Sequence, residues 1–430
     1  MITLRAVALA LATAAAGYAA QPASAAPRSP RFAFDTVPVY QHLAAVNTSL
    51  FPAARAAWLA RTYPIIVIEH VQDQGYLYTP PPGARTWGPE PFAPPTAFFE
   101  DAAARVAAQL KQLNASTVVL YYENANAGLP WYRLSAPLAS AAHPEFRLKN
   151  GSCHGARGRG GRGGGGGGGG GAVGGDAMVP YESFDFDHRV DGVQAWFVES
   201  FLDTAARFPV FDGVYIDQDA SSTCSAAQFA AVVATAAAMQ AARPDLIVGF
   251  DETNGVPSGA AGFRAAMDYS LCAPTVPGRP PPRLNSGLDA YRWLQANGDA
   301  GVISLAHDGA DAPNDGLYNY SLSVFLAGMH ATTPSYFAFC SMRKDAPLWE
   351  DCWDGGSDEA PVFPTWCAGM GASPDFQRPL GAPLGPAAPT GRPGDEVTRS
   401  FAGGTTVTVQ LSGEACLIAW GDGHRTVCAM

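Results

Sequence analysis

Acidic residues stand directly after several short apolar runs in this sequence of 430 residues. In the clearest case, the run Gly213–Ile216 leads to Asp217, and Asp219 follows two positions later. Glu252 and Asp268 stand at the ends of two other runs. A pair of carboxyl groups can cleave a glycosidic bond, because one protonates the leaving oxygen while the other attacks or activates water. The spacing therefore predicts acid–base chemistry on a sugar if the fold brings two of these acids together.

The candidate catalytic residues are Asp217, Asp268 and Glu252. Other polar and aromatic residues near the same run ends suit the binding of sugar hydroxyls and rings. These candidate substrate-binding residues are Tyr122, Glu123, Asn124, Trp131, Asp187, Asp219 and His307. Some have a second interpretation: Asp219 either touches ligand or caps the following loop, and Asp268 is either a site residue or a surface residue. Asp212 begins its run, which favours a structural turn or cap.

Eight apolar runs, most of them alternating with helical patterns, imply a parallel sheet. Eight is the number of strands that closes a (βα)8 TIM barrel, and in such a barrel the carboxyl ends of the strands form the active-site face. An open doubly wound sheet would carry a Gly-rich turn after a strand, and none of these runs is followed by one. We expect the barrel over residues 60–345. The predicted strands are 64–70, 117–124, 182–187, 213–216, 246–252, 265–270, 301–308 and 335–339.

The sequence outside this pattern divides into three parts. Residues 155–175 are glycine with a few arginines and predict a disordered surface insertion. Residues 346–394 form a connecting segment rich in proline and glycine, and residues 395–430 show short alternating strands with Gly turns. We therefore expect a small all-β appendage after the barrel.

The N-terminus and the cysteines indicate a secreted protein. Residues 1–25 have the basic start, apolar core and small-residue end of a signal peptide, with cleavage expected after Ala25. Eight cysteines permit disulfides, and their spacing favours local bridges within the cluster Cys340, Cys352 and Cys367 and between Cys416 and Cys428. The net charge of −11 argues against nucleic acid or anionic membrane as a partner. We expect a monomer that has no membrane segment after the signal is removed.

Several motifs resemble secreted glycoside hydrolases with a TIM barrel, of the endo-α-1,4-polygalactosaminidase type (glycoside hydrolase family 114-like). They are Leu120–Asn124, Leu129–Leu134, Phe184–Phe186, Phe211–Asp217 and Ala266–Asp268, and the stretch from Leu322 to Gly404 is similar to algal and protist relatives of that group. The resemblance implies that Asp217 is the nucleophile or key carboxylate. It also implies a proton donor on the sixth strand. Asp268 matches that position, where the family usually has Glu, and Glu252 is the substitute.

The leading hypothesis is a secreted glycoside hydrolase that acts on a polysaccharide or glycoconjugate and needs no cofactor. Asp217 acts as nucleophile or base, and Asp268 or Glu252 acts as general acid. The alternative is a carbohydrate-binding barrel that has lost catalysis, which the shorter Asp268 motivates. A third hypothesis is a metal-dependent hydrolase, although no D-x-D-x-D-G calcium loop is present and no second histidine stands at ligand spacing from His307.

Overall fold

The computed structural model describes fourteen segments of the chain. They are residues 29–43, 50–51, 53–68, 98–128, 132–134, 144–146, 184–217, 226–251, 264–268, 287–310, 315–341, 374–390, 395–413 and 415–428. The predicted signal peptide, the Gly-rich insertion 155–175 and most of the connecting segment 346–394 lie outside these residues. No helix in the described segments is long and apolar enough to cross a bilayer.

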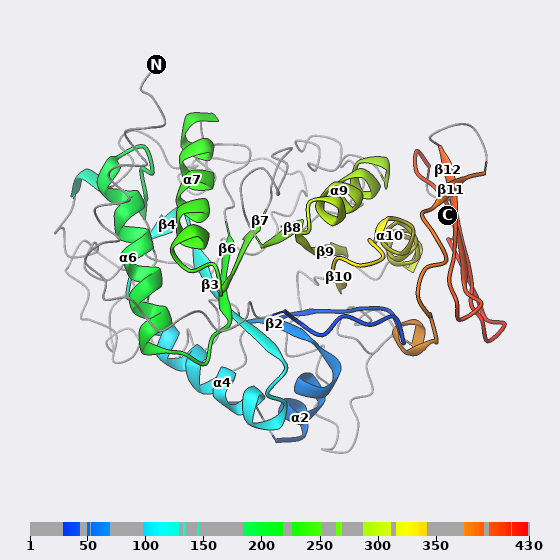
Figure 1. The fold of residues 1–430 in the computed structure, drawn as a ribbon, viewed down its shortest axis with the longest axis horizontal. Helices are drawn as coiled ribbons and strands as arrows, with labels where there is room; N and C mark the ends of the chain where they lie inside the picture. The colour runs from blue at the N-terminus through cyan, green and yellow to red at the C-terminus, as the bar shows by residue number, and fades with distance from the viewer. Residues whose placement is uncertain are drawn as a thin grey trace, which may run out of the picture.

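Within the described residues, eight strands pair in parallel in the order β1-β2-β3-β6-β7-β8-β9-β10 (Figure 1). An isolated parallel bridge between Val39 and Phe337 joins the first strand region to the last. The strands are β1 (Gln41–Leu43), β2 (Ile65–Ile68), β3 (Val118–Asn124), β6 (Gly213–Asp217), β7 (Ile247–Asp251), β8 (Ala265–Asp268), β9 (Ile303–Ala310) and β10 (Ser335–Ser341). The predicted TIM barrel is confirmed.

Helices cover the outside of the barrel, which is why its strands are apolar on both faces (Figure 1). All four residues of β2 and all seven of β3 are buried. The helices are α2 (Ala53–Thr62), α4 (Phe99–Leu113), α6 (Asp191–Arg207), α7 (Ala226–Ala242), α9 (Gly287–Asp299) and α10 (Asp315–Gly328), with 3-10 turns at Pro144–Phe146 and Pro374–Gln377. Five of the six match the helical stretches that the sequence pattern predicts, at residues 96–113, 189–208, 225–242, 285–296 and 318–330, and α2 is the addition.

The membership of the barrel differs from the prediction at one strand. The predicted third strand, residues 182–187, is not in the barrel: β5 (Phe184–Asp185) pairs antiparallel with β4 (Ala127–Gly128) beyond the end of β3. The missing barrel strand is β1, which lies before residue 60 and pairs with β2. Phe184 and Asp185 take Gly128 and Ala127 as their backbone partners instead of a parallel barrel strand. Asp217 remains on the fourth barrel strand and Asp268 on the sixth.

Gly213 opens the strand that carries Asp217, and the close approach of β7 requires it. Its φ is +157°, and an added Cβ would lie 1.9 Å from the carbonyl oxygen of Ile247. A side chain at this position would push β7 away from β6. The glycine therefore fixes the start of the strand whose other end carries the candidate carboxylate.

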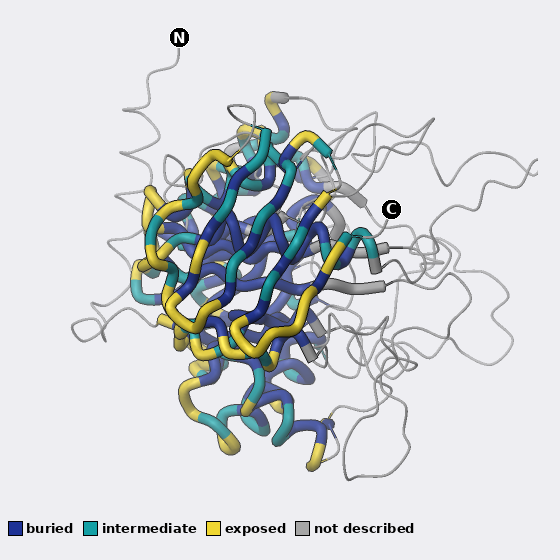
Figure 2. Tube along the Cα trace, turned by 90° about the vertical axis from the view of Figure 1, so that its right-hand side faces the viewer, coloured by how far each residue is buried: buried dark blue, intermediate teal, exposed yellow. Residues whose placement is uncertain are grey.

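The appendage is an antiparallel sheet that packs on α10 (Figure 1). In the described residues its strands are β11 (Ala388–Pro389), β12 (Glu396–Ser400), β13 (Thr406–Gln410), β14 (Cys416–Ala419) and β15 (Arg425–Val427). Buried and part-exposed positions alternate along them (Figure 2), as the sequence pattern predicts. Arg399, itself 3% exposed, donates to the carbonyl oxygens of Leu326 and Ala327 at the end of α10. The Cys416–Cys428 disulfide closes the last hairpin.

Candidate active site

The pleat of β3 divides its side chains between two environments. Tyr122 lies against Tyr215 of β6, with ring centroids 5.8 Å apart, on the barrel interior. Tyr121 faces the helices, because its hydroxyl interacts with Thr204 of α6. Since successive residues of a strand point to opposite faces, Asn124 shares the interior with Tyr122, and Glu123 shares the helix-facing side with Tyr121.

Asp217 is held at the carboxyl end of β6 by residues from the neighbouring strand β3. The hydroxyl of Tyr122 donates a short hydrogen bond to Oδ2 of Asp217. The amide of Asn124 donates to the same Tyr122 hydroxyl oxygen at 3.1 Å. The backbone N–H of Ala125 donates to the carbonyl oxygen of Asp217 at 2.8 Å. Three predicted site residues, Asp217, Tyr122 and Asn124, are therefore brought together.

The direction of these hydrogen bonds favours the ionised form of Asp217. Because Asn124 donates to the Tyr122 oxygen, the single hydroxyl proton of Tyr122 is free to point at the carboxylate. A hydrogen bond donated to a carboxylate stabilises its charge, and a chain of two such bonds polarises the phenol further. This arrangement suits a nucleophile or base, which must be unprotonated, and does not suit a general acid.

Two histidines that face the barrel interior continue the row of rings from Tyr122 and Tyr215. The His42 ring lies 5.1 Å from the Tyr215 ring and 6.1 Å from the His307 ring. Tyr40 lies 3.3 Å from His307 through its hydroxyl and Nδ1. His307 is thus a hydrogen-bonding residue of the interior, and its role in substrate binding stays a prediction.

Sequence reasoning missed His42 and Tyr40. The strand that carries His42 has only three residues, and Pro38 interrupts the apolar residues before it. The signal that could have found it is the short apolar pattern Val37–Tyr40, which ends in the polar residues Gln41 and His42 like the other strand ends.

Glu123, predicted to bind substrate, lies away from Asp217 and beside a second buried acid. Glu123 and Glu100 of α4 are 6% and 1% exposed. Burial raises the pKa of Glu100 from 4.5 to about 7. Burial, and secondarily the charge of Glu100, raises the pKa of Glu123 well above its ordinary value. The two acids form a carboxyl pair behind the strand rather than a group that faces the interior.

Asp187 stands on the segment before α6 and binds a neighbouring cation. Its carboxylate accepts two hydrogen bonds from the Arg189 guanidinium at 2.7 Å, and these bonds lower the pKa of Asp187. No described contact joins Asp187 to Asp217. The described hydrogen bonds of its carboxylate are with Arg189, and the predicted role of Asp187 in substrate binding stays a prediction.

The acid that would act together with Asp217 can be placed only by the backbone pairing of the strands that carry the candidates. Asp251 pairs with Met267 across β7 and β8, and Asp268 is the next residue along β8. Tyr215 pairs with Gly249 across β6 and β7, so position 251 falls on the same face of the sheet as positions 215 and 217, which is called here the same parity. Position 268 follows the partner of Asp251 and therefore has the opposite parity. Glu252, Asp219 and Trp131 lie outside the described residues. Among the described residues, no three His, Cys, Asp or Glu side chains are placed to hold a metal ion.

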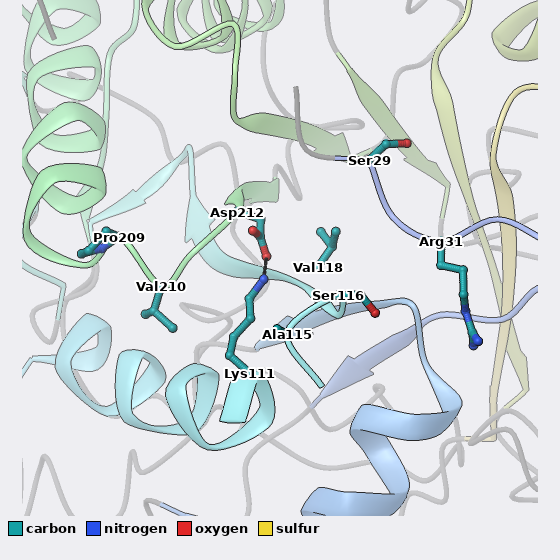
Figure 3. Close-up of a pocket in the computed structure, with 9 residues that line it drawn as sticks. All are labelled: Ser29, Arg31, Lys111, Ala115, Ser116, Val118, Pro209, Val210 and Asp212. Atoms are coloured by element: carbon teal, nitrogen blue, oxygen red, sulfur yellow. Dashed lines mark hydrogen bonds and ion pairs between the residues drawn. The ribbon is translucent and has the colours of Figure 1, made fainter. Parts of the chain in front are cut away.

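A cavity of about 620 Å³ lies at the opposite end of the barrel, where Figure 3 shows Lys111 paired with Asp212. Asp212 is 1% exposed and accepts hydrogen bonds from Lys111 at 2.5 Å and from the backbone N–H of Val119 at 2.7 Å. The carboxylate thereby ties the starts of β3 and β6 together. Because this is the amino-terminal end of the strands, we interpret the cavity as part of the supporting face.

Comparison with known proteins gives only distant likenesses. No protein-family model and no curated protein matches the sequence. The glycoside hydrolase domain of PelA from Pseudomonas aeruginosa is similar in structure at 13% identity and a TM-score of 0.39, covering 72% of this chain and 95% of that one. The maltogenic α-amylase AmyB from Thermotoga neapolitana has 11% identity, a TM-score of 0.42 and coverage of 88% and 87%.

A cyclic α-maltosyl-(1→6)-maltose hydrolase from Arthrobacter globiformis is also similar, at 11% identity and a TM-score of 0.43, with coverage of 94% and 97%. With TM-scores this low, none of these likenesses carries an argument about function. The fold rests on the strand topology itself, and the function must be argued from the residues at the barrel end.

Proposed function

We propose that this protein is a secreted glycoside hydrolase that acts on a polysaccharide or glycoconjugate by paired-carboxylate chemistry. The observation that carries the proposal is the hydrogen bond from Tyr122 to Asp217 at the carboxyl end of the fourth barrel strand. That end of a TIM barrel is where catalytic residues gather. Asp217 acts as the nucleophile or as the base that activates water.

The polar chain through Tyr122 and Asn124 supports this role for Asp217. It fixes the orientation of the carboxylate and favours its charge before substrate arrives, which is the preorganisation that catalysis requires. An oxocarbenium-like transition state places positive charge on the sugar, and an oriented carboxylate stabilises that charge. The neighbouring His42 and His307 are suited to bind sugar hydroxyl groups.

The general acid comes from the fifth or sixth barrel strand, as Glu252 or Asp268. Asp251 joins these candidates and is preferred to Asp268 by the strand register, because position 251 has the same parity as Asp217 whereas position 268 has the opposite parity. Adjacent strands lie about 4.8 Å apart, so acids on the fifth or sixth strand begin within about 10 Å of Asp217. Side chains can close that separation to either of the spacings that glycosidases use, about 5 Å or about 6.5–9.5 Å.

The test is a glycan-panel hydrolysis assay that compares wild type with Asp217→Asn and with each of Asp251→Asn, Glu252→Gln and Asp268→Asn. We expect wild type to cleave at least one glycan and Asp217→Asn to lose at least about a hundredfold in kcat/KM, as loss of a covalent or basic catalyst does. One of the three partner variants should show a comparable loss. The matched control is Asp212→Asn, which alters a buried carboxylate at the opposite end of the same strand.

Three results would contradict the proposal. Full activity in Asp217→Asn would remove Asp217 from the mechanism. Binding of a glycan without cleavage of any glycan on the panel would favour a carbohydrate-binding barrel that lacks catalysis. Loss of wild-type activity on addition of a chelator would instead indicate a metal-dependent hydrolase.

A further inference from the structure

His188 lies buried behind the end of β3 and contacts two elements with its two ring nitrogens. Its exposure is 0%, and the Phe197 ring packs 4.7 Å from the imidazole. Nε2 lies 2.5 Å from the carbonyl oxygen of Ala125, just beyond β3. Nδ1 lies 3.0 Å from the hydroxyl of Thr235 on α7. The ring therefore bridges a helix of the outer layer to the strand end.

The partners of His188 determine its protonation. A carbonyl oxygen can only accept, so Nε2 carries the proton and donates to Ala125. The hydroxyl of Thr235, which also donates to the carbonyl oxygen of Ala231 at 3.0 Å, lies within hydrogen-bond distance of Nδ1. Burial lowers the pKa of His188 from 6.5 to about 4, in agreement with a neutral ring near neutral pH.

The residue that His188 binds is joined directly to Asp217. Ala125 accepts from His188 through its carbonyl oxygen and donates through its N–H to the carbonyl oxygen of Asp217 at 2.8 Å. The preceding residue, Asn124, supplies the amide that binds Tyr122. One residue of backbone thus separates the imidazole from the hydrogen bonds that orient the carboxylate.

A second contact makes the attachment a two-point clamp. The N–H of Phe186 donates to the carbonyl oxygen of Asn126 at 2.8 Å, next to the bond that His188 makes. The carbonyl oxygen of Phe186 accepts in turn from the side chain of Gln228 on α7 at 2.7 Å. The segment 186–188 is therefore anchored to α7 on one side and holds two consecutive carbonyl groups beyond β3 on the other.

We infer that His188 is a positioning residue, which fixes the end of β3 through Ala125 and so holds Tyr122 and Asn124 against Asp217. This inference rests on the proposed function for its catalytic consequence but not for its structural content. Ala125 is 2% exposed, so its carbonyl group would lose its donor without gaining water if the imidazole were removed. The end of β3 would then gain freedom to move away from β6.

Amide hydrogen exchange tests the clamp without any substrate. His188→Leu removes the donor and keeps an apolar side chain, whereas His188→Gln keeps an N–H that can reach Ala125. We expect His188→Leu to lower the exchange protection of the Ala125 amide about tenfold more than that of Ile247, the loss that one buried hydrogen bond implies. The Ile247 amide serves as reference because it donates to Asp212 at the amino end of the barrel.

The matched control is Gln240→Leu, another buried polar residue replaced by leucine. Gln240 also lies on α7 and bonds Leu246 and Val248 at the amino end of β7. We expect this variant to reduce the protection of Ile247 at least as much as that of Ala125. In the glycan assay we expect His188→Leu to lower kcat about tenfold with little change in KM, and His188→Gln to restore most of it.

Three outcomes would overturn the inference. Equal loss of protection at Ala125 and Ile247 in His188→Leu would mean that the residue serves global stability alone. Unchanged protection at Ala125 would mean that no clamp exists. Local loss of protection with full kcat would mean that the clamp does not position the site. If wild type hydrolyses no glycan, the proposed function fails, and the exchange comparison still decides whether His188 clamps β3.

Discussion

Replacing Glu100 with glutamine should change how the stability of this protein depends on pH. Glu100 is 1% exposed, and its Oε1 accepts from the backbone N–H of Arg133 at 3.0 Å. Among the described residues, its Oε2 has no hydrogen-bond partner. Burial raises its pKa from 4.5 to about 7. The folded protein therefore binds the Glu100 proton more tightly than the unfolded chain does.

The sign and the size of the effect follow from that shift. Below pH 4.5 Glu100 is protonated in both the folded and the unfolded state, so its ionisation does not change the free energy of unfolding. As the pH rises to about 7, Glu100 ionises first in the unfolded chain, and the free energy of unfolding falls. At about 1.4 kcal/mol per pKa unit, the loss across this interval is about 3 kcal/mol. Glu123 adds to it in the same direction, because the pKa of Glu123 is also raised.

Urea unfolding of wild type and Glu100→Gln below pH 4.5 and above pH 7 measures the difference. We expect the variant to lose about 3 kcal/mol less than wild type across the interval. Above pH 7 it should be about 2 kcal/mol more stable, because unmet amide hydrogens offset about 1 kcal/mol. His188 works in the opposite direction, since its pKa is lowered from 6.5 to about 4 and its contribution is lost as the pH falls. The contribution of His188 is the same in wild type and in Glu100→Gln, so it cancels when the two proteins are compared.

Glu396→Gln, which removes the charge of an acid on the appendage strand β12, is the control for the change in net charge. If Glu100→Gln changes stability by the same amount at both pH values, Glu100 ionises in the folded protein as it does in the unfolded chain. The reasoning from burial would then be refuted.

Two further predictions concern how the appendage is held. Arg399→Met should lower the free energy of unfolding by about 3 kcal/mol, because it removes the donor to buried carbonyl groups at the end of α10. A loss below about 1 kcal/mol in urea titrations would contradict the role of this contact. Replacing both Cys416 and Cys428 with alanine should lower the free energy of unfolding by about 3 kcal/mol, because the unfolded chain gains the entropy of the opened loop. The amides of β14 and β15 should then lose exchange protection at a lower temperature, and unchanged protection would contradict this role of the disulfide.

The sequence by itself determined the class of fold and most of its strands. Runs such as Ile65–Ile68 and Gly213–Ile216 are apolar at every position because both faces of a parallel strand are covered. The alternation in residues 395–430 likewise predicted a sheet with one buried face. These patterns are local, so they can be recognised without knowing which strands become neighbours. The position of Asp217 at a strand end follows from the same local pattern.

Tertiary structure decided which short segments join the barrel. Gln41–Leu43 is too short to hold strand geometry alone, and it becomes a strand because β2 pairs with it and Phe337 closes the bridge beside it. Phe184–Asp185 has a similar local pattern but finds its partner in Ala127–Gly128, outside the barrel. Hydrogen bonds from distant residues made the difference, and no local pattern encodes them.

Tertiary structure also decided what each site residue contacts. Glu123 and Asn124 are adjacent in sequence, yet the pleat sends one to Glu100 and the other to Tyr122. Sequence pattern gives the alternation, but only the packed barrel tells which face is the interior. His188 carries no sequence signal at all, because its role depends on Ala125, 63 residues earlier, folding back onto it. The carboxylate could be predicted, and the residues that orient it required the fold.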